Sequence, residues 1–229
     1  MLHDLKQNTE LRRNPTMANI QKYKRSEVGH LCAHYERSAS NYSNTDIDLT
    51  RTADNYNLAP DHGMSQTAYI NQALTNIHHA NRKDLVVMAT CIVNVPTTLA
   101  PEFHQKFLQE SYNFLIDRYG TKSGLGENVC ISCYVHTDES SQSEHMHFAF
   151  LPVITDPVYG KKFGAKYCID RNDVKTLHQD LNNWLTEHGV RADVLNGKTQ
   201  RDSTGRALSV REMKYRDCNY QHEYSAKRW

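Results

Sequence analysis

The chain has 229 residues, of which 38% are hydrophobic and 23% are charged, and its formal net charge is +1. This length suits one domain with a tail, and the composition excludes a chain that is disordered throughout. The longest apolar run, residues 85–95, is far shorter than the roughly 20 residues that a membrane-spanning helix needs, so we expect no membrane span. A charge this close to zero does not by itself predict nucleic-acid binding.

Residues 1–17 are polar and show no periodicity, which predicts a disordered leader. They hold no apolar segment of the kind that a secretory signal needs, so we expect a cytoplasmic protein. The six cysteines are scattered, and the CxxC pair of Cys130 and Cys133 lies in an apolar run with no second pair. Buried free thiols are therefore favoured over a zinc site or redox chemistry.

The first third of the chain predicts a strand, two helices and a long loop. Residues 20–23 favour a short strand, and Ser26 is a suitable N-cap for a helix that continues to Arg37. Residues 38–60 are rich in Ser, Asn, Asp and Thr and predict a loop, of a length that is usually functional or disordered inside a domain. A second helix is expected over residues 64–81.

The middle of the chain alternates between strand and helix patterns. Residues 85–95 are apolar and β-branched, which predicts a buried strand, and residues 101–119 form an amphipathic helix pattern. Strands are expected over residues 128–136 and 144–153, separated by a polar turn, and the strongest helix pattern covers residues 171–188. Together these elements predict an α+β fold in which helices pack on a central antiparallel sheet.

The polar turn between the two expected strands is flanked by histidines. His145 and His147 alternate with Met146, so on a strand both imidazoles face the same side. His136 ends the preceding strand, which we expect to pair beside this one, and it can supply a third nitrogen. This arrangement is suited to a shared metal ion.

Two acidic residues strengthen the metal-site interpretation. Asp138 and Glu139 follow at the turn, where either can serve as an outer partner, a ligand or a base. Surface histidines are the alternative, and a lone HxH is a weak pattern, but three histidines and two carboxylates in twelve residues favour a site. Neutral imidazoles suit Mn²⁺, Zn²⁺, Ni²⁺ or Fe²⁺, and such an ion with open positions acts as a Lewis acid.

Three segments resemble the motifs of the Mob/Pre plasmid mobilisation relaxases, the MOBV class of the HUH endonuclease superfamily. The N-terminal motif is matched by AHYERS at residues 33–38, and the second motif by NTDIDLTRTADNYNL at residues 44–58. The metal motif is matched by the histidine and acidic residues between 136 and 147. The turn is about two residues longer than is usual in that family, and Glu144 stands where the family has proline.

The resemblance implies an HUH relaxase catalytic domain over residues 18–200 and a polar tail over residues 201–229. It implies site- and strand-specific nicking and rejoining of DNA at a plasmid transfer origin, through a covalent 5′-phospho-protein intermediate, at the start of mobilisation or recombination. The expected cofactor is a divalent metal, Mn²⁺ with Mg²⁺ as the other candidate. The expected partners are plasmid DNA, single-stranded or as a hairpin, and a second copy of the chain through a C-terminal region that this sequence lacks.

The matched motifs also imply roles for single residues. His34 takes the place of the nucleophile, Arg37 contacts phosphate or keeps His34 neutral, and Glu139 orients or deprotonates the nucleophile. The implied metal ligands are His136, His145 and His147. Three residues of the second motif are implied to position DNA or the active-site loop: Arg51, Asn55 and Tyr56.

Alternatives remain for the nucleophile and for the function. Most HUH enzymes use tyrosine, and Tyr35 adjoins His34; on a helix the two side chains point about 100° apart, so only one can face the metal. The family motif favours His34. A rolling-circle replication initiator would share the chemistry, a non-catalytic autoregulator would bind DNA without cutting it, and an unrelated metal hydrolase would act on small molecules.

Overall fold

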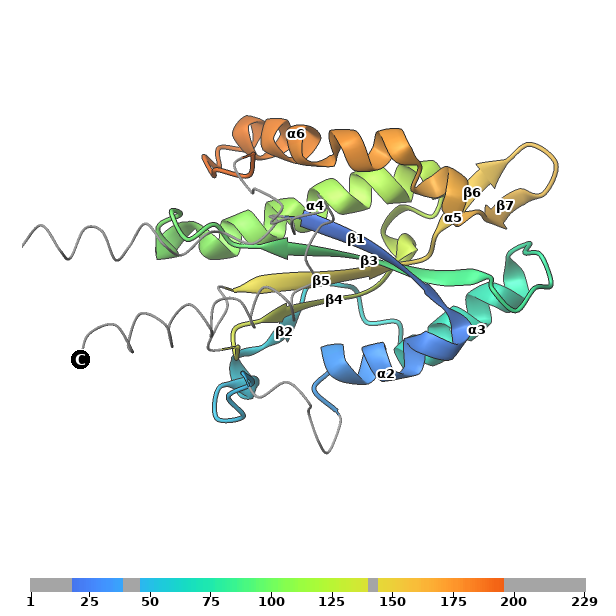
Figure 1. Cartoon of the computed structure of the whole chain (residues 1–229), viewed down its shortest axis with the longest axis horizontal. Helices are drawn as coiled ribbons and strands as arrows, with labels where there is room; N and C mark the ends of the chain where they lie inside the picture. Colours follow the sequence, from blue (N-terminus) through green and yellow to red (C-terminus); the bar gives the residue numbers. More distant parts are fainter. Residues whose placement is uncertain (1–17, 39–45, 140–143, 196–229) are drawn as a thin grey trace, which may run out of the picture. The chain divides into compact units, whose positions relative to one another are not determined.

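A computed structural model of the chain describes residues 18–38, 46–139 and 144–195 (Figure 1). The strands are β1 (Ala18–Lys24), β2 (Tyr56–Asn57), β3 (Val86–Asn94), β4 (Cys130–His136), β5 (His145–Phe150), β6 (Val153–Asp156) and β7 (Gly160–Phe163). The helices are α2 (Arg25–Tyr35), α3 (Gln66–Asn76), α4 (His104–Ser123), α5 (Ala165–Cys168) and α6 (Arg171–Glu187), with short 3-10 turns η1 (Thr52–Asp54), η2 (Pro101–Phe103) and η3 (Gly126–Val129). The predicted leader over residues 1–17 and tail over residues 201–229 lie outside the described residues.

Five strands form one sheet in the order β1-β3-β5-β4-β2, and each neighbouring pair is antiparallel. Helices α4 and α6 cover one face of this sheet, and α2 and α3 cover the other (Figure 1). The predicted α+β fold with a central antiparallel sheet is therefore confirmed. A separate hairpin of β6 and β7 follows β5.

Alternation along β5 divides its side chains between the two faces. Met146, Phe148 and Phe150 belong to the core cluster under α4 and α6, whereas Ala149 packs in the cluster on the α2 and α3 side. Because successive side chains of a strand point to opposite faces, the two histidines of β5 share the face of Ala149. The metal motif is thus directed toward helix α2.

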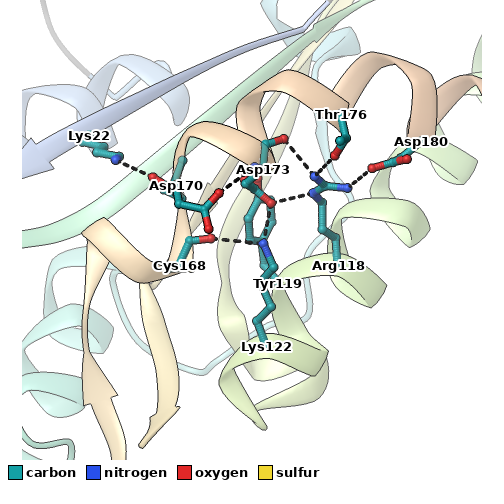
Figure 2. Close-up of polar contacts among 10 residues, drawn as sticks. Lys22, Arg118, Tyr119, Lys122, Cys168, Asp170, Asp173, Thr176 and Asp180 are labelled. Carbon is teal, nitrogen blue, oxygen red and sulfur yellow. Dashed lines mark hydrogen bonds and ion pairs between the residues drawn. The ribbon is translucent and has the colours of Figure 1, made fainter.

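A polar cluster joins α6 to α4 (Figure 2). The carboxylate of Asp173 accepts hydrogen bonds from Arg118 Nε (2.9 Å), from the Tyr119 hydroxyl (2.8 Å) and from Lys122 Nζ. The Asp173 side chain is only 1% exposed. Because a buried carboxylate is costly without compensating donors, these contacts are needed where the two helices meet. Asp170 caps α6 by accepting from the Asp173 backbone N–H (2.8 Å).

Several predicted boundaries were wrong, each for a local reason. Helix α2 begins one residue before Ser26, with Lys24 as its N-cap, because the Glu27 side chain accepts from the Lys24 backbone N–H at 2.7 Å. It ends at Tyr35 rather than at Arg37, because Arg37 adopts a left-handed φ of 53°. The described part of the predicted loop contains the 3-10 turn η1 and strand β2.

Two other expected elements also differ from the structure in length. The strand expected over residues 144–153 ends at Phe150, and the β6–β7 hairpin and the short α5 that follow were not predicted. The helix expected over residues 64–81 is shorter, with Ser65 as N-cap accepting from the Ala68 N–H.

Five of the cysteines are buried free thiols as predicted, while Cys218 lies outside the described residues. No helix in the described ranges is long and apolar enough to cross a membrane.

Candidate active site

Three histidine rings meet at one end of β4 and β5. The two strands pair so that His136 lies opposite His145, as expected from the hairpin, and His147 is two residues further along. The ring centroids are 4.7 Å apart for His136 and His147, 5.0 Å for His145 and His147, and 5.5 Å for His136 and His145. All three residues are at most 6% exposed. The sheet therefore buries three imidazoles in mutual contact.

Several nitrogens of these rings have no protein partner among the described residues. The Nε2 of His136 donates to the Tyr35 backbone carbonyl at 2.9 Å, which leaves its buried Nδ1 with a free lone pair. Both ring nitrogens of His147 are buried without a hydrogen-bond partner. Because buried polar atoms are costly when unsatisfied, such nitrogens are well suited to hold a metal ion.

Burial keeps His136 and His147 in the neutral form, which is the form that can bind a metal ion. It lowers the pKa of His136 to about 4, with the charge of Arg37 acting in the same direction. It lowers the pKa of His147 well below its usual value, and the neighbouring His145 adds to this. A neutral imidazole is the ligand form, so near neutral pH no proton has to leave these two rings before coordination.

Two overlapping groups of side chains could each hold a metal ion, because within each group the donor atoms all lie within 4.8 Å of one another. One set is His34, His136 and His147, and the other is His136, Glu139 and His145. The residues expected from the sequence to bind metal, to attack and to act as base thus meet in one place. A divalent cation that accepts nitrogen ligands fits this donor set.

His34 reaches the site from the last turn of α2. Its ring centroid is 5.9 Å from the rings of both His136 and His147. Burial lowers the pKa of His34, and the charge of Arg37 lowers it further. Arg37 Nη1 lies 3.4 Å from His34 Nδ1. His34 is therefore a neutral imidazole at neutral pH, and it lies beside the buried rings of His136 and His147.

Arg37 connects helix α2 to the turn after β4. Its Nη2 and Nε donate to the two carboxylate oxygens of Asp138 at 2.7 and 3.0 Å, and Nη2 also donates to Glu139 Oε1 at 3.0 Å. The Arg37 and Asp138 side chains are 2% and 0% exposed. Burial alone would raise the pKa of Asp138, but hydrogen bonds from Arg37, Asn55 and Thr52 bring it down to about 2. This charged cluster holds Glu139 beside the histidines.

The segment that resembles the second family motif supports the same turn. Thr52 donates its hydroxyl to Asp138 at 3.0 Å, and the Asn55 side-chain oxygen accepts from the Thr137 N–H at 2.8 Å. Asn55 is therefore directed into the protein. Arg51 is exposed, and Tyr56, on the edge strand β2, is 36% exposed. Of the three residues expected to position DNA, these two lie at the surface.

Tyr35 occupies a different position from His34. Its ring stacks on His147, with centroids 4.6 Å apart and an interplanar angle of 29°, and the residue is 2% exposed. Its hydroxyl faces the side chains of Thr90 and Tyr23, and burial raises its pKa. The sequence identified Tyr35 only as an alternative nucleophile. No sequence signal indicated the contacts of its ring and carbonyl with two metal-motif histidines.

The fold and the site define the class of protein. A histidine–hydrophobic–histidine strand in a central antiparallel sheet, completed by a third histidine from its neighbour, is the arrangement of an HUH-type relaxase domain. Residues 12–213 match the family described as "Plasmid recombination enzyme" (Mob_Pre), and the chain belongs to this family.

Individual relatives agree with this assignment. The plasmid recombination enzyme of Bacillus thuringiensis is 24% identical over 85% of this chain, and that of Lactiplantibacillus plantarum is 28% identical over 86%. The chain spans only 42% and 52% of the lengths of these two relatives. The MobM relaxase domain, bound to plasmid pMV158 oriT DNA in a Mn-bound crystal structure, superimposes with a TM-score of 0.69 at 26% identity, covering 88% of this chain and 98% of that one.

Proposed function

We propose that this chain is a metal-dependent DNA relaxase that nicks and rejoins one strand at a plasmid transfer origin. One observation carries the proposal: a neutral, partly buried His34 lies against buried imidazoles whose nitrogens have no partner among the described residues. That combination supports the assignment of His34 as a nucleophile beside a metal-binding set. The match to a relaxase domain described as bound to transfer-origin DNA supports this substrate class.

We assign the cation to His136, His145 and His147, and name Mn²⁺ because the matching relaxase domain is described as Mn-bound. Mg²⁺ is the less suitable candidate, since it prefers oxygen ligands in strict octahedral geometry. When bound there, the ion would supply positive charge to stabilise the scissile phosphate. The three histidines contribute by holding that charge in a buried site, where electrostatic stabilisation is strong.

His34 carries the covalent step in this proposal. A lone pair of its imidazole attacks phosphorus in line; the phosphorus–nitrogen bond forms, the bond from phosphorus to the 3′ oxygen breaks, and that oxygen takes a proton. Glu139, whose charge faces His34, takes up the proton that the imidazole loses. The adduct keeps the bond energy, so the 3′ hydroxyl can attack it and reseal the strand without a nucleotide triphosphate.

Arg37 serves this step by placing both reacting side chains. It lowers the pKa of His34, and its guanidinium fixes Glu139. Exposed Arg51 is placed to contact phosphate, and Tyr56 to stack on a base. Tyr56 borders an open pocket of about 340 Å³ that Thr137, Glu144 and His104 also line. A cytoplasmic location, expected from the N-terminal sequence, and a homodimer, implied by the family resemblance, belong to the same proposal.

A covalent-adduct assay tests the proposal. The protein is incubated with Mn²⁺ and a supercoiled plasmid that carries its cognate transfer origin, the mixture is denatured, and protein-linked DNA is measured. We expect an adduct with the wild type and with Tyr35→Phe, and none with His34→Ala. His30→Ala, an exposed histidine on the same helix, is the matched control and should retain the adduct.

Three outcomes would contradict parts of the proposal. Loss of the adduct in Tyr35→Phe alone would transfer the nucleophile to tyrosine. Cleavage at an origin of replication instead of a transfer origin would indicate a rolling-circle initiator. DNA binding without any nick in the presence of Mn²⁺ would indicate a non-catalytic autoregulator.

A further inference from the structure

We infer that Tyr35 is a positioning residue for the metal centre, acting on His147 through its ring and on His136 through its backbone carbonyl. The inference rests on the proposed metal centre and adds a residue to which neither the family motif nor the mechanism gives this role. It also explains why a buried tyrosine stands directly beside the proposed nucleophile without taking part in the covalent step.

The first argument concerns the orientation of His147. A metal-binding histidine is usually held by a hydrogen bond from its second ring nitrogen to a carboxylate or carbonyl. Among the described residues His147 has no such partner at either nitrogen. The flat face of Tyr35, stacked at 4.6 Å and 29°, therefore provides the contact that fixes the rotation of this imidazole.

The second argument concerns the tautomer of His136. Its Nε2 donates to the Tyr35 carbonyl at 2.9 Å, so the proton of the neutral ring is on Nε2 and the lone pair is on Nδ1. That Nδ1 is the buried nitrogen without a partner. One residue thus fixes the plane of one proposed ligand and the binding nitrogen of another.

The third argument is that Tyr35 itself is held in place. It is 2% exposed, it is the last residue of α2, and its hydroxyl faces Tyr23 on β1 and Thr90 on β3. A ring buried this deeply can hold the end of α2, and with it His34, at a constant distance from the proposed metal ligands. We conclude that Tyr35 couples the position of the nucleophile to the geometry of the metal site.

Mn²⁺ binding to the protein without DNA tests this role. Calorimetry, with the electron paramagnetic resonance spectrum of the bound ion, is compared for the wild type, Tyr35→Phe and Tyr35→Leu. Phe keeps the ring and the carbonyl, so we expect its dissociation constant to stay close to that of the wild type. Leu removes the flat face, and we expect the constant to rise by about tenfold or more with an altered spectrum, as when an outer-shell partner of a ligand is lost.

A matched control separates this effect from general destabilisation. Tyr69 stacks on His62 with centroids 3.8 Å apart and an interplanar angle of 13°, outside the metal site. Tyr69→Leu should leave Mn²⁺ affinity unchanged. If Tyr35→Leu does not fold, judged by circular dichroism, Tyr35→Met keeps most of the buried volume without a flat face and should show the same loss of affinity.

Equal Mn²⁺ affinity in the folded Tyr35→Leu or Tyr35→Met protein would overturn the inference, as would an equal loss in Tyr35→Phe. Absence of Mn²⁺ binding by the wild type would overturn both this inference and the proposed metal centre. Failure to nick any DNA, with the difference between the Phe and Leu variants intact, would contradict only the proposed function.

Discussion

Burial gives the histidines of this site a chemistry different from that of surface histidines. It lowers the pKa of His136 to about 4 and that of His147 well below its usual value. Protons would then compete with a metal ion at His136 only when the pH falls toward 4, and at His147 only at a pH well below the usual pKa of histidine. The site therefore differs from three exposed histidines in its response to mild acid.

The pH dependence of Mn²⁺ affinity tests this difference. From about pH 7.5 to about pH 5.5, an exposed histidine with a pKa near 6.5 would reduce the apparent affinity about tenfold. His136 and His147 should contribute almost nothing over this range, so we expect a total loss of about tenfold or less by calorimetry. A loss near a thousandfold would show that all three rings titrate as exposed histidines do, and would contradict the role given to burial.

Among the described residues, Arg37 is the cationic partner that two buried carboxylates, Asp138 and Glu139, share, and its removal takes this positive charge away from both. We expect Arg37→Gln to lower the free energy of unfolding by about 3 kcal/mol or more, measured by urea denaturation near neutral pH. Arg82→Gln is the matched control, because the Arg82–Asp84 pair is 60% and 58% exposed. It should change the free energy by about 0.5 kcal/mol or less.

The effect of Arg37→Gln on the free energy of unfolding should also depend on pH, in a direction that the pKa of Asp138 predicts. The pKa of Asp138 is lowered to about 2 in the folded protein, so its interaction with Arg37 stabilises the fold above its unfolded pKa and is lost as the pH falls through about 2. The difference between wild type and Arg37→Gln should therefore narrow in acid. A difference that is constant down to this range would mean that lost packing, and not charge, accounts for the effect.

Residue roles were predictable from the sequence where a motif carried them. Alternation in a strand was enough to place His145 and His147 on one face, and the expected hairpin placed His136 on the neighbouring strand. The structure gives the register, in which His136 lies opposite His145. The contact between Arg37 and Asp138 was not predictable, because the two are 101 positions apart and depend on how α2 returns to the sheet. The stacking of Tyr35 on His147 was not predictable for the same reason.

At the scale of elements, the contact between α4 and α6 depends on Asp173. Its carboxylate accepts hydrogen bonds from three residues of α4, which are Arg118, Tyr119 and Lys122 (Figure 2). Asp173→Asn keeps the shape of the side chain but removes the negative charge that faces Arg118 and Lys122. We expect it to lower the free energy of unfolding by about 3 kcal/mol in urea denaturation, as when a buried ion pair is broken.

Asp180 provides the control for this prediction. It also accepts from Arg118, at 2.7 Å, but its side chain is 41% exposed. Asp180→Asn should cost about 1 kcal/mol or less. Equal effects of the two substitutions would contradict the importance of burial at Asp173. Because the cluster lies on the α4 and α6 side of the sheet, we expect the folded fraction of Asp173→Asn to bind Mn²⁺ as the wild type does.

The elements that the sequence predicted well are those with a buried face. Strand β3 and helices α4 and α6 have long apolar patterns and formed close to their expected positions. The β6–β7 hairpin was missed because Gly160–Phe163 is short and mostly polar, so alternation gives no signal there. The start of α2 was misplaced because its cap depends on Glu27 bonding back to the chain, not on the Ser26 hydroxyl.

At the scale of the domain, the site is assembled from segments that are far apart in the sequence. Helix α2 provides His34 and Tyr35, and Arg37 follows the end of this helix. The β4–β5 pair provides the three metal-motif histidines, and η1 supports the turn after β4. Such an assembly is stable only when the sheet brings these segments together. The order of the family motifs predicted that they would meet, but not which hydrogen bonds hold them.

The chemical nature of the protein–DNA bond is the most direct test of the proposal that His34 attacks phosphorus beside a histidine metal centre. The adduct formed with Mn²⁺ and cognate transfer-origin DNA is digested, and the linked peptide is sequenced by mass spectrometry before and after mild acid. A phosphorus–nitrogen bond on the peptide that contains His34, lost in mild acid and stable in alkali, is the predicted result. An acid-stable phosphotyrosine, at Tyr35 or elsewhere, would contradict it.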